Sequence, residues 1–101
     1  MKIIYNSFLP FKGFSAIALF GVIFARKEFK PLSNKMVRHE QIHAAQAADC
    51  GGWMLFYLQY LIYHCKYGYK DNPFEIEAYC NDFKKDYLIS RQKFGWKIYE
   101  N

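Results

Sequence analysis

Apolar residues fall into short runs over the first third of the chain and recur at helical spacing after it. Residues 2–5 (KIIY) have the composition of a short strand, and Pro10 and Gly13 mark a turn. The runs 15–20 and 22–29, rich in Ile, Val and Phe, flank Gly21, and a glycine so placed suggests a tight turn or a bulge. We expect a β-hairpin or a bent strand here, while periodicity leaves open a helix over 14–25.

Three principal helices are expected after this region, because start and stop signals flank three segments of helical composition. Ser33 or Asn34 can cap the first, and Gly51-Gly52 can end it. Asn72 is a typical cap for the third, with Pro73 at its first position. The expected helices cover 35–50, 53–66 and 73–90, and the third carries Ile76, Tyr79, Cys80, Phe83 and Tyr87 on one face. The aromatic tail around 94–96 is expected to pack back on the core.

Length and composition indicate one folded domain. The 101 residues are 52% hydrophobic and 21% aromatic, enough for a single modest core. The fold class is therefore predicted as α+β, mainly helical, with one compact domain over 1–101. Three cysteines without a C-x-x-C pair imply no disulfide framework, which favours a reducing compartment such as the cytoplasm.

The charge distribution argues against a nucleic-acid partner. The net charge is +5, but the basic residues are scattered rather than gathered in one stripe. The apolar runs 14–25 and 53–63 are shorter than the roughly 18–20 residues that a membrane-spanning helix needs. They are expected to be core elements, with peripheral membrane contact as an alternative because both are unusually apolar.

The segment 36–46, MVRHEQIHAAQ, carries the candidate chemistry. His39 and His43 are four residues apart, so on a helix they lie on one face a turn apart and can bind one zinc ion. Glu40 is rotated by about 100° from His39, where it can accept a proton from a metal-activated water. A polar helix with two surface histidines is the alternative, and this short pattern alone does not decide between them.

A third ligand must come from another part of the chain. Asp49 lies six residues after His43, but the metzincin-like pattern that uses this spacing needs a glycine where Gln46 stands. The segment 72–79, NPFEIEAY, offers Glu75 and Glu77, which point to opposite sides of a helix. Glu75 also occupies the position of a capping-box glutamate, which is its alternative role.

Residues 75–78, Glu-Ile-Glu-Ala, match the E-x-x-A pattern of gluzincin-type zinc metallopeptidases. Over most of residues 8–80 the chain also resembles small bacterial proteins of the minigluzincin type. The resemblance implies a zincin-like core in which Glu75 is the third zinc ligand and Ala78 packs against the helix of the two histidines. Glu77 is the fallback ligand. Tyr79 stands where the better-known pattern has Asp or Asn, so a ligand histidine must find its hydrogen-bond partner elsewhere.

The supporting residues expected around the site are the following. Gln46 and Asp82 are candidates to orient a ligand histidine. Tyr79 and His64 are candidates to support a ligand or to stabilise an oxyanion.

The resemblance implies a zinc-dependent peptidase with a peptide or protein substrate and Glu40 as general base. It also implies a sheet edge that holds the peptide by strand addition, for which we expect residues 22–29. Two alternatives remain: a non-catalytic zinc-binding interaction module, which a chain this short could form at a membrane surface, and a metal-free helical interaction protein.

Overall fold

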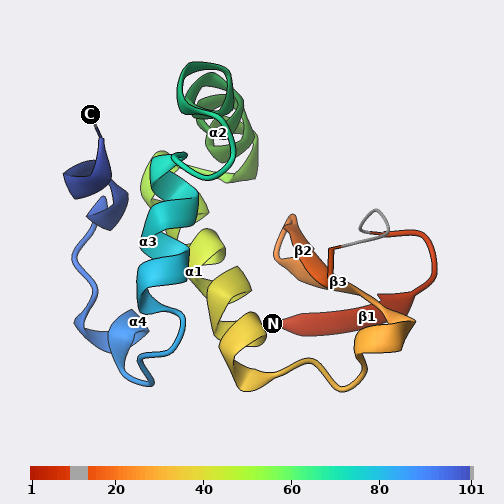
Figure 1. Cartoon of the computed structure of the whole chain (residues 1–101). Helices are drawn as coiled ribbons and strands as arrows, with labels where there is room; N and C mark the ends of the chain where they lie inside the picture. The colour runs from red at the N-terminus through yellow and green to blue at the C-terminus, as the bar shows by residue number, and fades with distance from the viewer. Residues whose placement is uncertain (10–13, 101) are drawn as a thin grey trace.

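The computed structural model describes residues 1–9 and 14–100 and has an α+β architecture. A small sheet from the N-terminal part lies beside a group of helices formed by the rest of the chain (Figure 1). The radius of gyration is 13.1 Å, close to the value of about 13 Å expected for a compact chain of 100 residues. The predicted fold class is confirmed, whereas the turn expected at Pro10 and Gly13 lies outside the described residues.

The sheet has three strands in the order β1-β3-β2, namely β1 (Lys2–Asn6), β2 (Ala16–Leu19) and β3 (Val22–Arg26). The strands β2 and β3 form an antiparallel hairpin whose two-residue turn is Phe20-Gly21. Both turn residues have positive φ, 50° and 85°, as a turn that matches the twist of such a hairpin requires. The expected hairpin is therefore confirmed, and the alternative helix over 14–25 is wrong.

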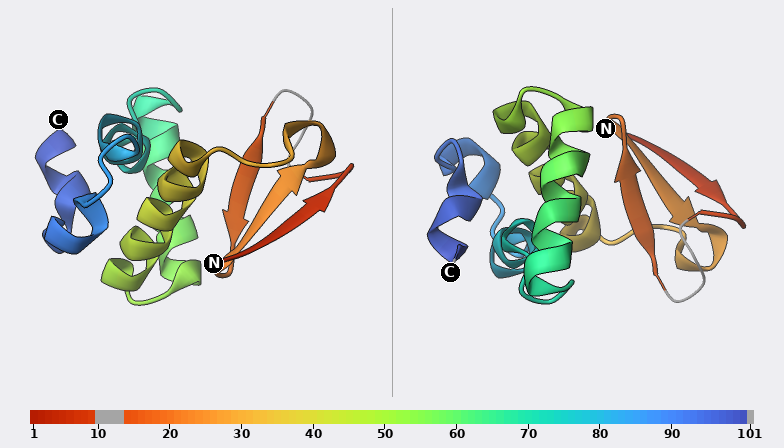
Figure 2. Two further views of the ribbon diagram at one scale, coloured as in Figure 1. Left: turned by 90° about the horizontal axis from the view of Figure 1, so that it is seen from below. Right: turned by 90° about the horizontal axis from the view of Figure 1, so that it is seen from above.

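The expected sheet edge at 22–29 is wrong. β3 is the central strand, because β1 pairs with it in parallel, with Lys2 opposite Val22 and Asn6 opposite Arg26. Residues Lys27–Phe29 leave the sheet as a short 3-10 helix, η1. The edge strand nearest the helices is β2, which packs against the first helix (Figure 2).

The helical part consists of α1 (Asn34–Cys50), α2 (Trp53–Tyr67), α3 (Pro73–Asn81), α4 (Tyr87–Ser90) and the 3-10 helix η2 (Gly95–Tyr99). The side chain of Ser33 caps α1 by accepting the Met36 N–H at 3.1 Å. Gly51 ends α1 in the left-handed conformation at φ 95°. Asn72 caps α3 by accepting the Phe74 N–H at 3.0 Å.

The third helix is shorter than predicted and buries a different face. It ends at Asn81, whose side-chain amide donates to the Glu77 carbonyl at 2.7 Å, as a local side-chain competitor of helix propagation does. Tyr79 and Phe83, from the expected apolar face, are 49% and 63% exposed. The residues of α3 that are buried are instead Pro73, Phe74, Glu75, Glu77, Ala78 and Asn81. Two of these residues, Glu75 and Glu77, carry carboxylates, and burial in an apolar core would be unfavourable for them. Polar or charged partners must therefore stabilise them there.

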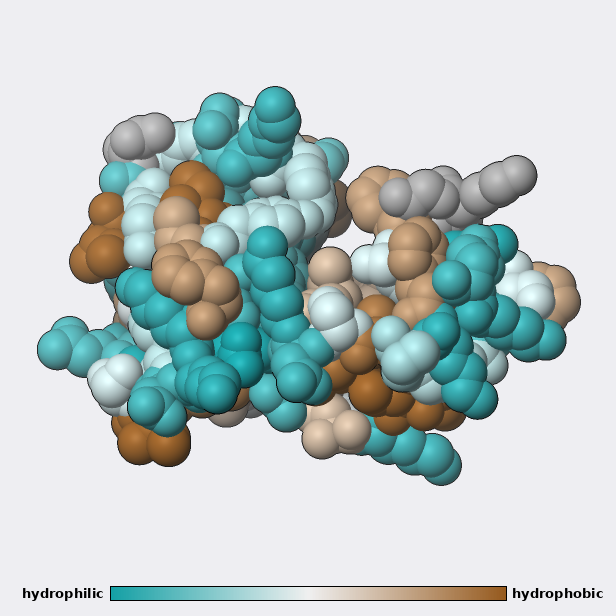
Figure 3. All heavy atoms as spheres, turned by 60° about the horizontal axis from the view of Figure 1, so that its bottom comes forward, coloured by the Kyte–Doolittle hydropathy of each residue, from teal (hydrophilic) through white to brown (hydrophobic). Residues whose placement is uncertain are grey.

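Aromatic side chains form the core where the helices meet. Phe74 is fully buried, and its ring centroid lies 4.7 Å from that of Phe56 and 4.8 Å from that of Trp96. Trp96 is only 3% exposed, which confirms that the tail packs back on the core. The space-filling view shows the sheet and the helices as two lobes with a hollow between them (Figure 3). Met36, His39, Glu40 and His43 of α1 line a cavity together with residues of β2.

Candidate metal centre

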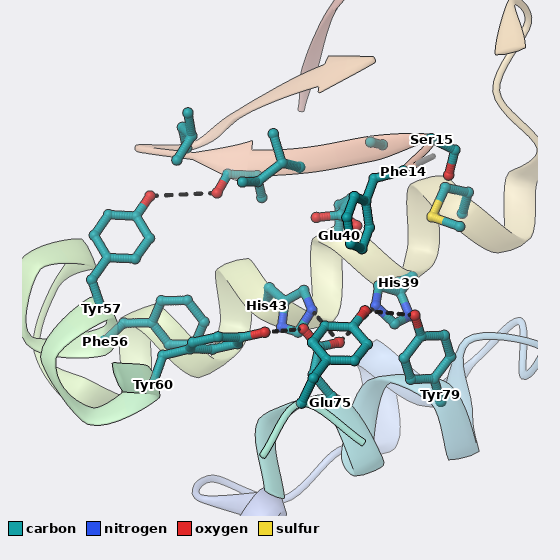
Figure 4. A pocket seen from close by; sticks show the side chains of 16 residues that line it. Phe14, Ser15, His39, Glu40, His43, Phe56, Tyr57, Tyr60, Glu75 and Tyr79 are labelled. Carbon is teal, nitrogen blue, oxygen red and sulfur yellow. Dashed lines mark hydrogen bonds and ion pairs between the residues drawn. The ribbon is translucent and has the colours of Figure 1, made fainter. Parts of the chain in front are cut away.

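Two helices bring three candidate ligands together (Figure 4). The face of α1 that is turned inward carries His39 and His43, which are 3% and 7% exposed. The first turn of α3 delivers Glu75, which is 5% exposed. The helical spacing of the histidines thus produces a shared face, and the packing of α1 against α3 adds the carboxylate.

The three side chains converge on one point. One oxygen of Glu75, Oε1, lies 3.2 Å from Nε2 of His39 and 3.3 Å from Nε2 of His43. One ligand atom from each residue lies within 4.8 Å of the other two. The imidazole planes are nearly perpendicular, at 83°, with ring centroids 4.9 Å apart. This buried group of two imidazole nitrogens and one carboxylate oxygen could hold a metal ion.

The ring of His39 is oriented by Asp82, which is almost fully buried. Nδ1 of His39 lies 3.1 Å from Oδ2 of Asp82. A carboxylate can only accept, so Nδ1 carries a proton, and Nε2 is the nitrogen that could present a lone pair to a metal ion at the convergence point. A carboxylate on the far nitrogen is a common support for a metal-ligating histidine. The structure therefore places Asp82 where such support was expected.

The ring of His43 is oriented by Gln46. Nδ1 of His43 lies 2.8 Å from Oε1 of Gln46. The other end of that amide, Nε2, donates to the Phe74 carbonyl and to Oε1 of Glu77, both at 2.9 Å. Because the amide nitrogen needs these acceptors, its oxygen must face the histidine, and Nδ1 of His43 must carry a proton. In this tautomer Nε2 of His43 is the atom left for a metal.

The charges in the group are strongly coupled. Burial acts to raise the pKa of Glu75, but His43 and the hydrogen bonds from His39, His43 and Tyr60 hold it well below its usual value. Burial acts to lower the pKa of His43, yet the adjacent Glu75 carboxylate raises it to about 9. The hydroxyl of Tyr60 donates to Oε2 of Glu75 at 2.6 Å, which occupies the second carboxylate oxygen. Glu75 is therefore an anion whose other oxygen, Oε1, lies between the two histidines, where a metal ion could bind.

Glu40 lies beside this group without belonging to it. Its side chain lies between α1 and the edge strand β2, and it is 5% exposed. Burial raises the pKa of Glu40, although the two histidines and the Ala18 N–H act to lower it. A buried carboxyl with a raised pKa next to a metal-type ligand set has the properties of a general acid or base.

A cavity of about 420 Å³ opens onto the group from the side of the sheet. Its walls are β2, α1 and α2 with aromatic residues from neighbouring segments, and they include Phe14, Ala16, Met36, Phe56, Tyr57, Tyr60, Tyr69 and Tyr79. The Tyr79 ring lies 4.4 Å from that of His39, and the Tyr79 and Tyr69 hydroxyls are 2.8 Å apart. Sequence reasoning missed Tyr69 and gave Tyr60 no role at the site, because nine tyrosines in the chain offer no pattern that separates these two.

The structure does not bring Glu77 or His64 into this group. Glu77 points to the opposite side of α3, where it is fully buried and bonded to Arg91, with Nε to Oε2 at 2.6 Å. His64 lies exposed near the end of α2 and does not line the cavity. Glu75 does not act as a capping-box residue either, since its carboxylate faces the histidines.

Comparisons of the chain with protein-family models, with curated proteins and with solved structures found no match. The resemblance to gluzincins therefore stays an expectation from short motifs.

Proposed function

We propose that this protein is a zinc-dependent hydrolase that cleaves peptide bonds. One observation carries the proposal: His39, His43 and Glu75 converge at a cavity that Glu40 also faces. Two histidines and one glutamate are the protein ligands of many catalytic zinc sites, which keep a fourth position for water or substrate. Among divalent ions, this nitrogen-rich and buried ligand set suits zinc better than magnesium or calcium, which prefer oxygen.

Zinc, when bound, would act as a Lewis acid and lower the pKa of a water at the open position. Glu40 would accept a proton from that water and later donate it to the amine that leaves. Its burial favours this exchange, because it brings the pKa of the carboxyl closer to neutrality. Asp82 and Gln46 would hold both imidazoles in the ligating tautomer.

The edge strand supplies a place for an extended peptide. Arg26 N–H donates to the Ser15 carbonyl at 3.1 Å, so residue 15 faces β3. Because backbone groups alternate in direction along an antiparallel strand, Ala16 and Ala18 present theirs outward, toward the helices. A peptide added beside Ala16 would place its side chains against the aromatic wall of the cavity.

Metal content and hydrolysis in matched variants test the proposal. Wild-type protein purified with zinc should hold one ion per chain, and His39→Ala, His43→Ala and Glu75→Ala should lose it. Glu40→Gln should keep the ion and lose cleavage of a peptide library followed by mass spectrometry. If wild-type protein at neutral pH takes up no zinc, the proposal is wrong.

A non-catalytic zinc module is the second candidate, and one observation favours it. The Tyr57 hydroxyl accepts the Phe20 N–H at 3.1 Å and lies 3.4 Å from the Ala18 carbonyl, so it occupies part of the edge that a peptide would use. Tight zinc retention without cleavage of any library peptide, in wild type and in Tyr57→Phe alike, would favour this candidate over the hydrolase.

A further inference from the structure

The outer face of α2 carries five large aliphatic side chains that the fold leaves uncovered. We call this set the α2 apolar face: Met54, Leu55, Leu58, Leu61 and Ile62. Their exposed fractions are 65%, 54%, 58%, 58% and 57%. At 100° per residue they fall within an arc of roughly 120° on one side of the helix. The opposite side, which carries Phe56 and Tyr63, is buried in the core.

This face differs from an ordinary surface in having no charge to desolvate. Residues 51–65 contain no Asp, Glu, Lys or Arg. A contiguous apolar patch of a few hundred Å² on a small protein commonly marks a binding surface, whereas single exposed apolar residues do not. The face therefore has the composition of a surface that a binding partner covers and shields from water.

Basic side chains lie along one side of the face and at its C-terminal end. Lys97 lines the same shallow groove as Leu55, Leu58 and Ile62. Lys66 follows the face directly at the C-terminal end of α2, where its ammonium lies 5.1 Å from the Tyr67 ring centroid. Asp49 also lines the groove, but it is paired with Arg91 at 2.8 Å. Lys66 and Lys97 therefore give this edge a charge that complements an anionic surface.

The dimensions decide between a membrane and a second copy of the chain. Five side chains that are 54–65% exposed present roughly 300 Å² of apolar surface, taking about 100 Å² for each when fully exposed, which falls short of the roughly 800 Å² per partner that a stable protein interface buries. The 15 residues of α2 make a helix of about 22 Å, less than the hydrocarbon thickness of about 30 Å. No helix in the described part of the chain is long and apolar enough to cross a membrane. An apolar helix face with a basic margin is instead suited to lie in the membrane interface.

We propose that the α2 apolar face docks this protein on an anionic lipid surface, with the helix axis parallel to the membrane plane. The aliphatic side chains enter the boundary between headgroups and acyl chains, and Lys66 and Lys97 contact lipid phosphates. The inference is independent of the proposed hydrolase activity, because it uses none of the metal-site residues.

Sedimentation with lipid vesicles tests the proposal. The full-length chain is mixed with vesicles of phosphatidylcholine alone or with about 30% phosphatidylserine, and the bound fraction is measured. Leu58→Gln/Leu61→Gln should reduce binding to the anionic vesicles at least about tenfold, from the apolar area removed. The matched control is Ile89→Gln/Ile98→Gln, two side chains that are 87% and 80% exposed outside the face, and it should bind as wild type does.

Three results would overturn the proposal: no binding of wild type to anionic vesicles, equal binding to neutral and anionic vesicles, or equal loss in the control variant. A concentration-dependent dimer that the Leu58→Gln/Leu61→Gln variant disperses would assign the face to a second copy instead. Circular dichroism spectra check that each variant is folded. If the double variant does not fold, Leu58→Gln and Met54→Gln are tested singly, and each should lose less vesicle binding than the double variant.

Discussion

Replacing Glu77 with glutamine removes the charge from a fully buried carboxylate behind the metal site. Its Oε1 accepts from Gln46 at 2.9 Å and from Nη2 of Arg91 at 3.1 Å. Its Oε2 accepts from the Tyr87 hydroxyl and from Nε of Arg91, both at 2.6 Å. Both oxygens face only donors here, so the amide nitrogen of a glutamine meets a donor in either orientation. The conservative substitution is therefore expected to be costly.

The magnitude follows from the burial of the pair. Breaking a buried ion pair by removing one partner costs about 3–5 kcal/mol. The lower end applies here, because Arg91 keeps Asp49 as a second partner at 2.8 Å. That is a large share of the 5–15 kcal/mol by which a native domain is typically stable. At about 4–8 °C per kcal/mol for a domain of this size, Glu77→Gln should melt at least about 12 °C below wild type.

Thermal unfolding of the chelator-treated protein at pH 7, followed by far-UV circular dichroism, measures this difference. The control is Glu28→Gln, because Glu28 pairs with Arg26 at 2.7 Å but its side chain is 50% exposed, which limits the pair to about 1 kcal/mol or less. If Glu77→Gln melts within about 4 °C of wild type, the reasoning from buried partners is refuted.

Three further predictions concern the site. Glu75 raises the pKa of His43 to about 9 against the opposing effect of burial. In the metal-free protein this pair therefore stabilises the fold fully below about pH 6.5, and its contribution is lost as the pH rises through about 9. A melting temperature that does not change between these two pH values would contradict this prediction. Asp82→Asn should weaken zinc binding about 10–100-fold in chelator competition while the saturating stoichiometry stays at one, and an unchanged affinity would exclude the orienting role. Tyr57→Phe removes the hydroxyl contacts with β2 and should cost about 1 kcal/mol in urea unfolding, whereas no loss would mean that they contribute nothing.

The features predicted best from the sequence are those that depend only on residues close together along the chain. The cap at Ser33, the stop at Gly51 and the shared face of His39 and His43 are all local, and the structure contains each of them. The hairpin turn at Gly21 is local in the same sense. The zinc assignment and the hydrolase activity stay predictions, because they concern a ligand and a reaction rather than the path of the chain.

The choice of the third ligand, which the sequence left open, and the sheet edge, which it placed wrongly, depend on segments far apart. The choice between Glu75 and Glu77 is set by how α3 turns against α1, and both glutamates are buried. The partner of Glu77 is Arg91, which lies 14 residues later and beyond the end of the helix. The sheet edge was misplaced because β1, 20 residues earlier, pairs with β3. No local signal encodes any of these contacts.

The hydroxyl of Tyr57 at the edge strand also bears on solubility. An edge strand with free outward N–H and C=O groups is a template for pairing with other chains, and such pairing leads to aggregation. Tyr57 engages Phe20 and Ala18, and α1 packs along the same strand. This contact covers the edge at Ala18 and leaves Ala16, so it shortens the stretch over which another chain could pair with the sheet. Loosening α2 from β2 should therefore promote self-association before it unfolds the chain.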